Sequence, residues 1–252
     1  MLTELLGLPT HPLTTFLGLV VGGLTFYGLL STLSYFYFFR WRKERYHPRY
    51  VEDPVQIKSA LKWSAVSLLG NAVLTTPFHL AVAYGWSEVY YDVADFGWPW
   101  LFASIAIYLA VTETMIYWVH RFLHWGPLWK YIHRPHHSFK QPTSFVGVAF
   151  NPLDSFAQGL AHHLCVFLFP VHVGVYLFFV AFVTVWAVMI HDRVSFVRWK
   201  GINYTGHHTV HHWYDNYNFG QFFTLWDRLG GTYKDPESSE VRAEVPEGVL
   251  RR

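Results

Sequence analysis

The feature that most constrains the fold of this chain is a run with no charged side chain, from Pro12 to Phe39. A helix needs about 20 apolar residues to cross the hydrocarbon core of a bilayer, so this run can span a membrane with some tilt. Of all residues, 52% are hydrophobic and 14% are charged, whereas soluble domains carry about 25% charged residues. The chain is therefore expected to be a membrane protein, and its composition excludes a disordered chain.

Three further apolar stretches are expected to lie in the membrane. Residues Trp63–Trp86 and Pro99–Val119 are each long enough for one crossing. The last stretch, Phe156–Ile190, is divided by Pro170, which interrupts helical hydrogen bonding. We expect a hinged hairpin there, because a hairpin keeps the histidine-rich segments described below on one side. The predicted fold class is all-α, a polytopic membrane protein with about four transmembrane elements in a single domain covering residues 1–252.

A basic cluster follows the first apolar run directly. It indicates that this end of the run faces the cytoplasm, because cytoplasmic loops are enriched in lysine and arginine. No basic n-region or cleavage site precedes the run, so no removable signal peptide is expected. The net charge of +2 argues against a nucleic-acid partner, and the single cysteine, Cys165, excludes an internal disulfide. The cluster comprises Arg40, Arg42, Lys43, Arg45 and Arg49.

Histidines form three short patterns after the third apolar stretch. One pattern is H-x-x-x-H and two are H-x-x-H-H, and residues three or four apart share one face of an α-helix. Such repetition indicates metal binding rather than scattered histidines. A tetrahedral zinc ion takes four ligands, so this many well-spaced histidines predict more than one metal ion. They are His120 and His124, then His133, His136 and His137, and finally His208, His211 and His212.

Several other polar residues leave alternatives open. His191 directly follows the last apolar stretch and is a further candidate ligand. His162 is more typical of a polar contact between helices. For His163, both a ligand role and a helix contact stay open. His207 lies one position off the shared face of its pattern. Glu113 lies two turns before the first histidine pattern on the same helical face. It either orients a ligand histidine or pairs with another polar group.

The expected position of the histidines at the membrane surface bears on their chemistry. Imidazole binds Zn, Cu, Fe and Ni, so the ligand type alone does not choose the metal. A hydrophobic substrate can present a reactive carbon from the bilayer to a site at this surface. Unactivated C–H bonds require a redox metal and O2 rather than a Lewis acid such as zinc. The location therefore favours oxidation of a lipid over hydrolysis.

The motifs resemble those of the fatty acid hydroxylase/sterol desaturase superfamily, and within it the sterol C-5 desaturases. The order of the three histidine patterns is specific to the superfamily. The connecting sequences point to the sterol branch, and the similarity runs from the first apolar run to Tyr233. These sequences are Y-W-V-H-R-F-L-H, L-W-K-Y-I-H-R-P-H-H, A-F-N-P-L-D-S-F and N-Y-N-F-G-Q-F-F-T-L-W-D-R-L-G-G-T-Y.

This resemblance implies a membrane enzyme that holds two iron ions in a cytoplasmic, histidine-rich cap and uses O2. It implies electrons from cytochrome b5 or another reduced carrier, such as one of the ferredoxin type, with an NAD(P)H-dependent reductase. The implied product is a Δ5 double bond in a Δ7-sterol. The implied location is the endoplasmic reticulum in a eukaryote or the inner membrane in a bacterium. The implied ligands are His120, His124, His133, His136, His137, His191, His208, His211 and His212.

Two alternative functions compete with this interpretation. A hydroxylase of the same superfamily would act on a fatty acyl chain, a sterol methyl group or a carotenoid. A histidine-rich transporter or metal-storage protein would carry polar ligands along a path at mid-membrane depth. The expected clustering of the histidines at one membrane face argues against this second class.

The region after the last histidine pattern becomes increasingly polar. Residues Gln221–Leu229 are expected to form a short amphipathic helix that ends at Gly230 and Gly231. The residues from Lys234 onward are polar, and we expect them to be poorly ordered.

Overall fold

A computed structural model describes residues 9–245 of the 252 residues. The prediction that no signal peptide is present concerns the N-terminal residues, and part of these lies outside the described residues. Helices dominate the described part of the chain. The long helices are α2 (Pro12–Tyr35), α4 (Pro54–Ala83), α5 (Gly97–Leu123), α8 (Pro152–Leu168) and α9 (Val173–His191). Shorter elements are η1 (Phe36–Trp41), α3 (Lys43–Tyr46), β1 (Val89–Tyr90), η2 (Val93–Asp95), α6 (Gly126–Leu128), η3 (Trp129–His133), α7 (Arg134–His137), η4 (Ser144–Val146), β2 (Val171–His172), α10 (Thr205–Tyr214), α11 (Leu225–Leu229) and α12 (Ser239–Glu244).

Four of the helices are long and apolar enough to cross a membrane: α2 with its extension η1, then α4, α5 and α9. Large apolar side chains on the outside of α2 are exposed, among them Val21, Leu29 and Leu33. Such a surface is stable only when lipid or another apolar partner covers it. The chain is therefore an integral membrane protein, and the prediction of a helical protein with four spanning helices is confirmed.

Two of the spanning helices extend beyond their predicted limits. Helix α4 begins at Pro54 rather than Trp63, because the Asp53 carboxylate caps it by accepting hydrogen bonds from the amides of residues 55 and 56, each 3.0 Å long. Lys58 and Lys62 lie in its first turns and hid this start from a hydropathy pattern. Helix α5 continues to Leu123, so that His120 lies inside the helix rather than after it.

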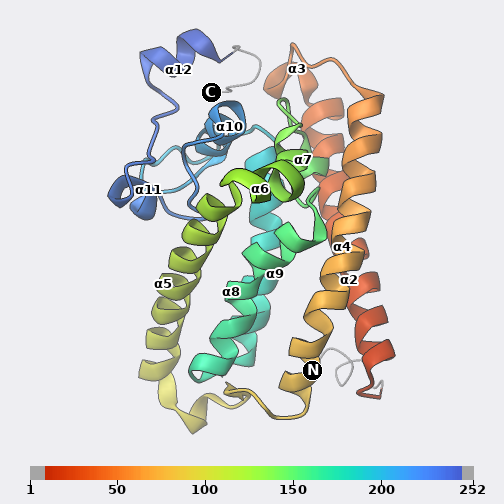
Figure 1. Ribbon diagram of the computed structural model, residues 1–252, viewed down its shortest axis with the longest axis vertical. Coiled ribbons are helices and arrows are strands. Elements are labelled where there is room, and N and C mark those ends of the chain that lie inside the picture. The colour runs from red at the N-terminus through yellow and green to blue at the C-terminus, as the bar shows by residue number, and fades with distance from the viewer. Residues whose placement is uncertain (1–8, 246–252) are drawn as a thin grey trace.

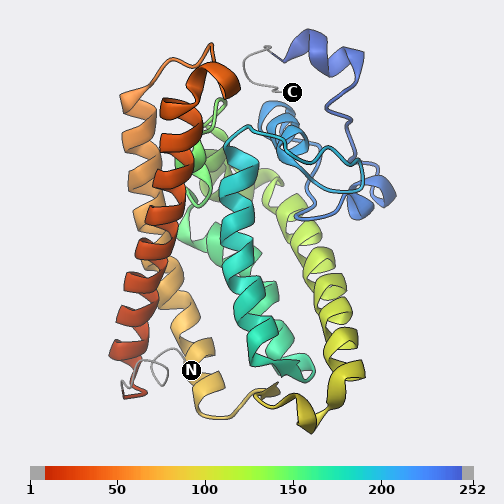
Figure 2. The same ribbon diagram turned by 180° about the vertical axis from the view of Figure 1, so that it is seen from behind.

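The predicted hairpin near Pro170 is confirmed. Helices α8 and α9 run antiparallel on either side of Pro170 (Figure 2). The turn between them contains β2, which pairs in parallel with β1 across two residues. Tyr108 of α5 and Tyr176 of α9 are fully buried where the hairpin packs. The hairpin therefore forms the centre of the bundle, with α4 and α5 packed against α8.

The short histidine-bearing helices gather at one end of the bundle. Figure 1 shows α6, α7 and α10 at the end where α5 finishes, and α3 lies at this same end. Helix α11 begins at Leu225, not at the predicted Gln221, although it ends before Gly230 as predicted. The expectation of poor order is wrong for residues 234–245, because they include α12 and Val241 is fully buried against Val210.

Candidate metal centre

Nine buried or half-buried histidines form two groups at this end of the bundle. Within each group, one nitrogen from every ring lies within 4.8 Å of the others. The groups touch, because the rings of His137 and His212 stack with centroids 4.7 Å apart. The structure thus brings together all nine histidines that the sequence marks as candidate ligands. The first group is His120, His124, His133, His137 and His211, and the second group is His136, His191, His208 and His212.

The two groups are assembled from four separate segments. Helix α5 supplies its last turn, η3 and α7 supply the H-x-x-H-H pattern, α9 ends in His191, and α10 supplies the second H-x-x-H-H pattern. Each H-x-x-H-H pattern divides between the groups: His208 and His212, four residues apart, face the second group, while His211 faces the first. One histidine pattern therefore holds both groups at a fixed separation.

Two buried histidines are oriented by carboxylates. His133 Nδ1 lies 2.6 Å from Asp154 Oδ2, and both side chains are fully buried. His137 Nδ1 lies 2.7 Å from Asp215 Oδ1. An imidazole that donates its Nδ1 hydrogen to a carboxylate presents the lone pair of Nε2 on its other side. Both rings are thereby fixed in the tautomer that can bind a metal through Nε2.

Three more histidines are oriented by backbone carbonyl groups. His120 Nδ1 donates to the carbonyl oxygen of Phe219 at 3.0 Å. In the same way, His191 Nδ1 donates to the Ala187 carbonyl at 2.6 Å and His211 Nδ1 to that of residue 217 at 2.7 Å. The Nε2 atoms of these rings therefore also carry the lone pair. The Nε2 atom of His211, and also that of His124, is buried and has no hydrogen-bond partner among the described residues.

The Nε2 atoms converge at distances that suit metal ligands. In the second group, His191 Nε2 lies 2.9 Å from His208 Nε2 and 3.2 Å from His212 Nε2. In the first group, His133 Nε2 lies 3.1 Å from both His120 Nε2 and His137 Nε2. Ligands about 2.1 Å from one ion and at right angles to each other are about 3.0 Å apart. Each group therefore has the spacing of a coordination shell.

Electrostatics also favours a metal over protons between these rings. Burial, together with neighbouring imidazoles, holds the pKa values of His136, His208 and His212 well below the ordinary value for histidine. These rings are therefore neutral, and neutral imidazole is the form that binds metals. Facing lone pairs repel each other, and a cation between them removes that repulsion. The donor set thus fits two metal ions.

The structure decides between the two roles considered for Glu113. Its carboxylate accepts hydrogen bonds from the backbone amides of Phe222 and Phe223, each 3.0 Å long, and the side chain is buried. It is therefore a structural partner of this loop. Asp227 binds the same loop from the other side, accepting from the amides of Phe219 and Gly220 at 2.7 and 2.9 Å. Together, Glu113 and Asp227 hold the loop whose Phe219 carbonyl group orients His120 of α5.

Replacing Glu113 with alanine is expected to lower the free energy of unfolding by about 3 kcal/mol, because two buried backbone amides lose their acceptors. Thermal unfolding in detergent measures this loss as a lower Tm. Glu113→Gln keeps one acceptor oxygen and is expected to lose less. An unchanged Tm in the alanine variant would show that the loop does not depend on this carboxylate.

Seven histidines lie outside the two groups, and four of these have local partners that account for them. His162 Nδ1 contacts the Tyr108 hydroxyl at 3.1 Å, and His163 Nδ1 contacts the Tyr176 hydroxyl at 2.7 Å. His207 and His172 likewise have local partners: the Tyr233 hydroxyl and the amide of residue 174. These residues therefore support helix packing and capping.

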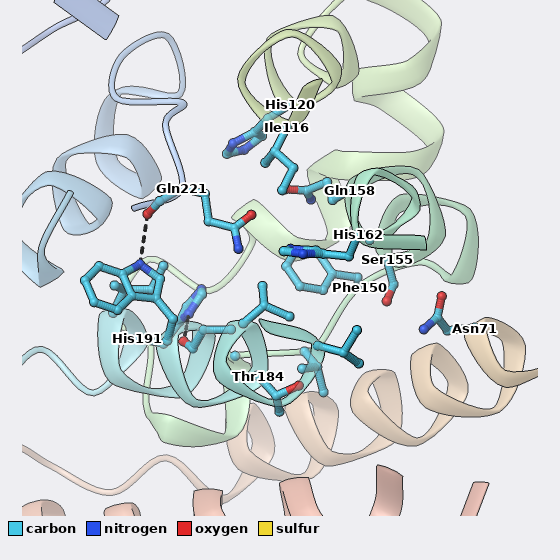
Figure 3. Close-up of a pocket in the computed structure, with 18 of the residues that line it drawn as sticks. Asn71, Ile116, His120, Phe150, Ser155, Gln158, His162, Thr184, His191 and Gln221 are labelled. Atoms are coloured by element: carbon cyan, nitrogen blue, oxygen red, sulfur yellow. Dashed lines mark hydrogen bonds between the residues drawn. The ribbon is translucent and has the colours of Figure 1, made fainter. Parts of the chain in front are cut away.

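A cavity of about 210 Å³ opens beside both histidine groups. It lies between α4, α5, α8 and α9, and His120 and His191 reach its wall (Figure 3). His208 lines the cavity as well. Apolar side chains form much of the remaining wall, including Ile116 and Val180. A hydrophobic molecule held between these helices would therefore meet histidines of both groups.

Comparison with known proteins places the chain in a family. The family model described as Fatty acid hydroxylase matches residues 105–232. The chain belongs to the fatty acid hydroxylase family. The matched segment contains both histidine groups and the carboxylates that orient them. The resemblance inferred from the histidine patterns is therefore confirmed.

Members of the family with named activities are similar over most of the chain. A lathosterol oxidase from Rattus norvegicus is 40% identical over 225 residues, which cover 87% of this chain and 74% of the relative. The human lathosterol oxidase is 39% identical over 230 residues, covering 89% and 76%. A Delta(7)-sterol 5(6)-desaturase from Leptosphaeria maculans is 38% identical over 234 residues, covering 92% and 65%. No solved structure matches the chain.

Three acidic residues of the family segment were not identified from sequence as part of the site. Asp154 and Asp215 contact ligand-type histidines, and Asp227 holds the adjacent loop. Asp215 has a sequence signal, since it follows the last histidine pattern by three residues. Asp154 has none, because it lies far from His133 along the chain and meets it only after α8 packs.

Proposed function

We propose that this chain is a membrane di-iron oxidoreductase that uses O2 and an external electron donor to introduce the C-5 double bond into a Δ7-sterol. The observation that carries the proposal is that two adjacent groups of neutral, oriented imidazoles border one largely apolar cavity between membrane-spanning helices. The identity of about 39% to lathosterol oxidases supports the choice of sterol and of position.

Each histidine group is proposed to hold one iron ion through its converging nitrogens. Bound there, the iron ions supply the redox chemistry with which O2 takes two hydrogen atoms from adjacent carbons. The overall reaction balances when O2 is reduced to two water molecules, with two hydrogen atoms from the two C–H bonds, two electrons from the carrier and two protons from the aqueous phase. The protein's own groups set the geometry: Asp154 and Asp215 fix the orientation of two rings, and the buried position excludes bulk water.

The centre is proposed to face the cytoplasm. Exposed basic residues of the segment after α2, such as Arg42 and Arg45, lie at the same end of the bundle as the histidines. His47 Nε2 contacts the carbonyl of Asp192 at 2.9 Å, which ties this segment to the residue after His191. By the positive-inside rule this end is cytoplasmic. Cytochrome b5 or a ferredoxin-type carrier with its NAD(P)H-dependent reductase could then deliver electrons from that side.

The proposed location follows from this topology: the endoplasmic reticulum in a eukaryote or the inner membrane in a bacterium. The segment with α10 to α12 folds onto the ends of α5 and α9, with Tyr117 bonded to Thr232 at 3.0 Å. We therefore propose that residues 1–252 act as one domain rather than as a membrane anchor with a separate cap.

Membranes containing the protein are expected to convert an added Δ7-sterol into the Δ5,7-sterol when NAD(P)H, O2 and a carrier system are present. Mass spectrometry of the extracted sterols measures the loss of two hydrogens. The matched control is the same membrane preparation without O2, in which no product is expected. A product that gains an oxygen atom instead would favour the hydroxylase alternative, and no change in any lipid would contradict an enzymatic role.

A further inference from the structure

The cavity beside the histidines contains three polar atoms that lack a hydrogen-bond partner. Among the described lining residues outside the two histidine groups, these atoms are Asn71 Oδ1, His162 Nε2 and Gln221 Nε2. All three are buried. A buried polar atom without a partner is costly, and native proteins retain few of them. Such atoms on the wall of a cavity indicate where a polar group of a bound molecule belongs.

Three hydrogen bonds fix the backbone around Gln221. The amide before it, that of Gly220, donates to Asp227 at 2.9 Å, and the amide after it, that of Phe222, donates to Glu113 at 3.0 Å. Its own carbonyl accepts from the Trp186 indole at 2.8 Å. Three contacts therefore hold the backbone while the side-chain amide stays unpaired. The side chain points into the cavity, as Figure 3 shows.

The position of Gln221 relative to the histidines follows from the chain itself. The carbonyl that orients His120 belongs to Phe219, two residues earlier, so the Cα atoms of residues 219 and 221 lie at most about 7 Å apart. Gln221 and His191 share the same cavity wall. In Figure 3, Asn71 lies on the opposite side of the view from both of them.

The chemistry of a sterol places its hydroxyl group close to the reacting carbons. The oxygen on C-3 is three covalent bonds from C-5, which corresponds to about 4 Å. A sterol whose C-5 faces the histidine groups must therefore place its hydroxyl beside them. His162 lies too far from the histidine groups for this role. It contacts Tyr108, and about 18 Å of helix α5 separates Tyr108 from His120. Gln221 is the unpaired group at the correct end of the cavity.

We propose that the side-chain amide of Gln221 donates a hydrogen bond to the 3-hydroxyl oxygen of the sterol substrate and so selects the carbons presented to the histidine groups. This inference rests on the proposed sterol desaturase function. The residue is a specificity determinant in this account, since the hydroxyl takes no part in the removal of hydrogen. Its loss should therefore affect hydroxylated substrates selectively.

The test compares kcat/KM for a 3β-hydroxy Δ7-sterol and for the same sterol lacking the hydroxyl, in membranes with the full electron-transfer system. The wild type is expected to prefer the hydroxylated sterol by about tenfold, the order of one good hydrogen bond. Gln221→Leu is expected to reduce this preference to near unity while leaving turnover of the 3-deoxy sterol unchanged. Gln221→Asn, which keeps the amide, is expected to retain part of the preference.

Asn71→Leu is the matched control, because it removes another unpaired polar atom from the same cavity at the far side. This variant is expected to keep the wild-type preference. An equal loss for both sterols in Gln221→Leu would indicate a structural role and overturn the inference, as would a wild type with no preference. Both of those results leave sterol desaturation standing, whereas no turnover of any Δ7-sterol by the wild type overturns the proposed function and the inference together.

Discussion

Replacing His211 in the first group or His136 in the second with alanine is expected to abolish turnover and to remove about one metal ion per chain. Each residue is fully or almost fully buried and belongs to a different group. Loss of a residue that merely orients a ligand costs about 10- to 100-fold in metal affinity or activity. Loss of a ligand should cost more than that. Elemental analysis of the purified variants and a sterol turnover assay measure the two effects.

His11→Ala provides the control for these variants. His11 lies at the start of α2, where its ring accepts a hydrogen bond from the amide of Leu13 and takes part in capping the helix. This variant is expected to keep both metal content and activity. Normal turnover in the His136 or His211 variant would refute the assignment of the corresponding group.

Asp154→Ala is expected to lower metal affinity and activity by about 10- to 100-fold. The carboxylate accepts a hydrogen bond from His133 Nδ1, which lies 2.6 Å from Asp154 Oδ2, and neither side chain is exposed. Without it the ring can adopt the other tautomer or rotate away from the first group. Metal titration into the protein stripped of metal, followed by activity measurement, determines the size of the change.

Two further variants test whether the effect comes from the orientation of His133, one at position 154 and one at a carboxylate away from the histidines. Asp154→Asn retains an oxygen that accepts the Nδ1 hydrogen, so it is expected to keep more of the metal affinity than the alanine variant. Asp92→Ala removes a carboxylate that caps η2 by accepting the amide of Ala94, and it should leave metal binding unchanged. Equal affinity in the wild type and in Asp154→Ala would show that His133 needs no such partner.

The spanning helices were largely predictable because hydrophobic length is a strong signal. The run from Pro12 and the hairpin at Pro170 both correspond to observed helices. The start of α4 was missed because a capping aspartate at position 53 sets it, while lysines in its first turns lower the local hydrophobicity. Hydropathy identifies the part of a helix that lies in lipid, whereas capping determines where the helix begins.

The grouping of the histidines was predictable only in part. Spacing of three and four residues placed His208, His211 and His212 on one face, but only His208 and His212 belong to one group, because His211 faces the other group. Spacing could not show that His191 joins them, since that depends on how α9 meets α10. The same limit applies to Asp154, which reaches His133 across two helices. Such contacts depend on tertiary packing, which local periodicity does not specify.

The C-terminal segment shows how composition misled the prediction. Polar residues from Lys234 onward indicated poor order, yet Val241 of α12 is fully buried against Val210. Likewise, the expected helix from Gln221 begins later because the amides of residues 222 and 223 bond to Glu113 instead of to a helical ladder. A buried carboxylate thus determines the local backbone more strongly than helix propensity.

The metal content of the purified, active protein tests the two-metal centre most directly. Elemental analysis combined with X-ray absorption at the iron edge is predicted to give two iron ions per chain, surrounded by nitrogen neighbours at about 2.1 Å. A fully active preparation that holds one ion per chain or fewer would contradict the assignment of an ion to each histidine group.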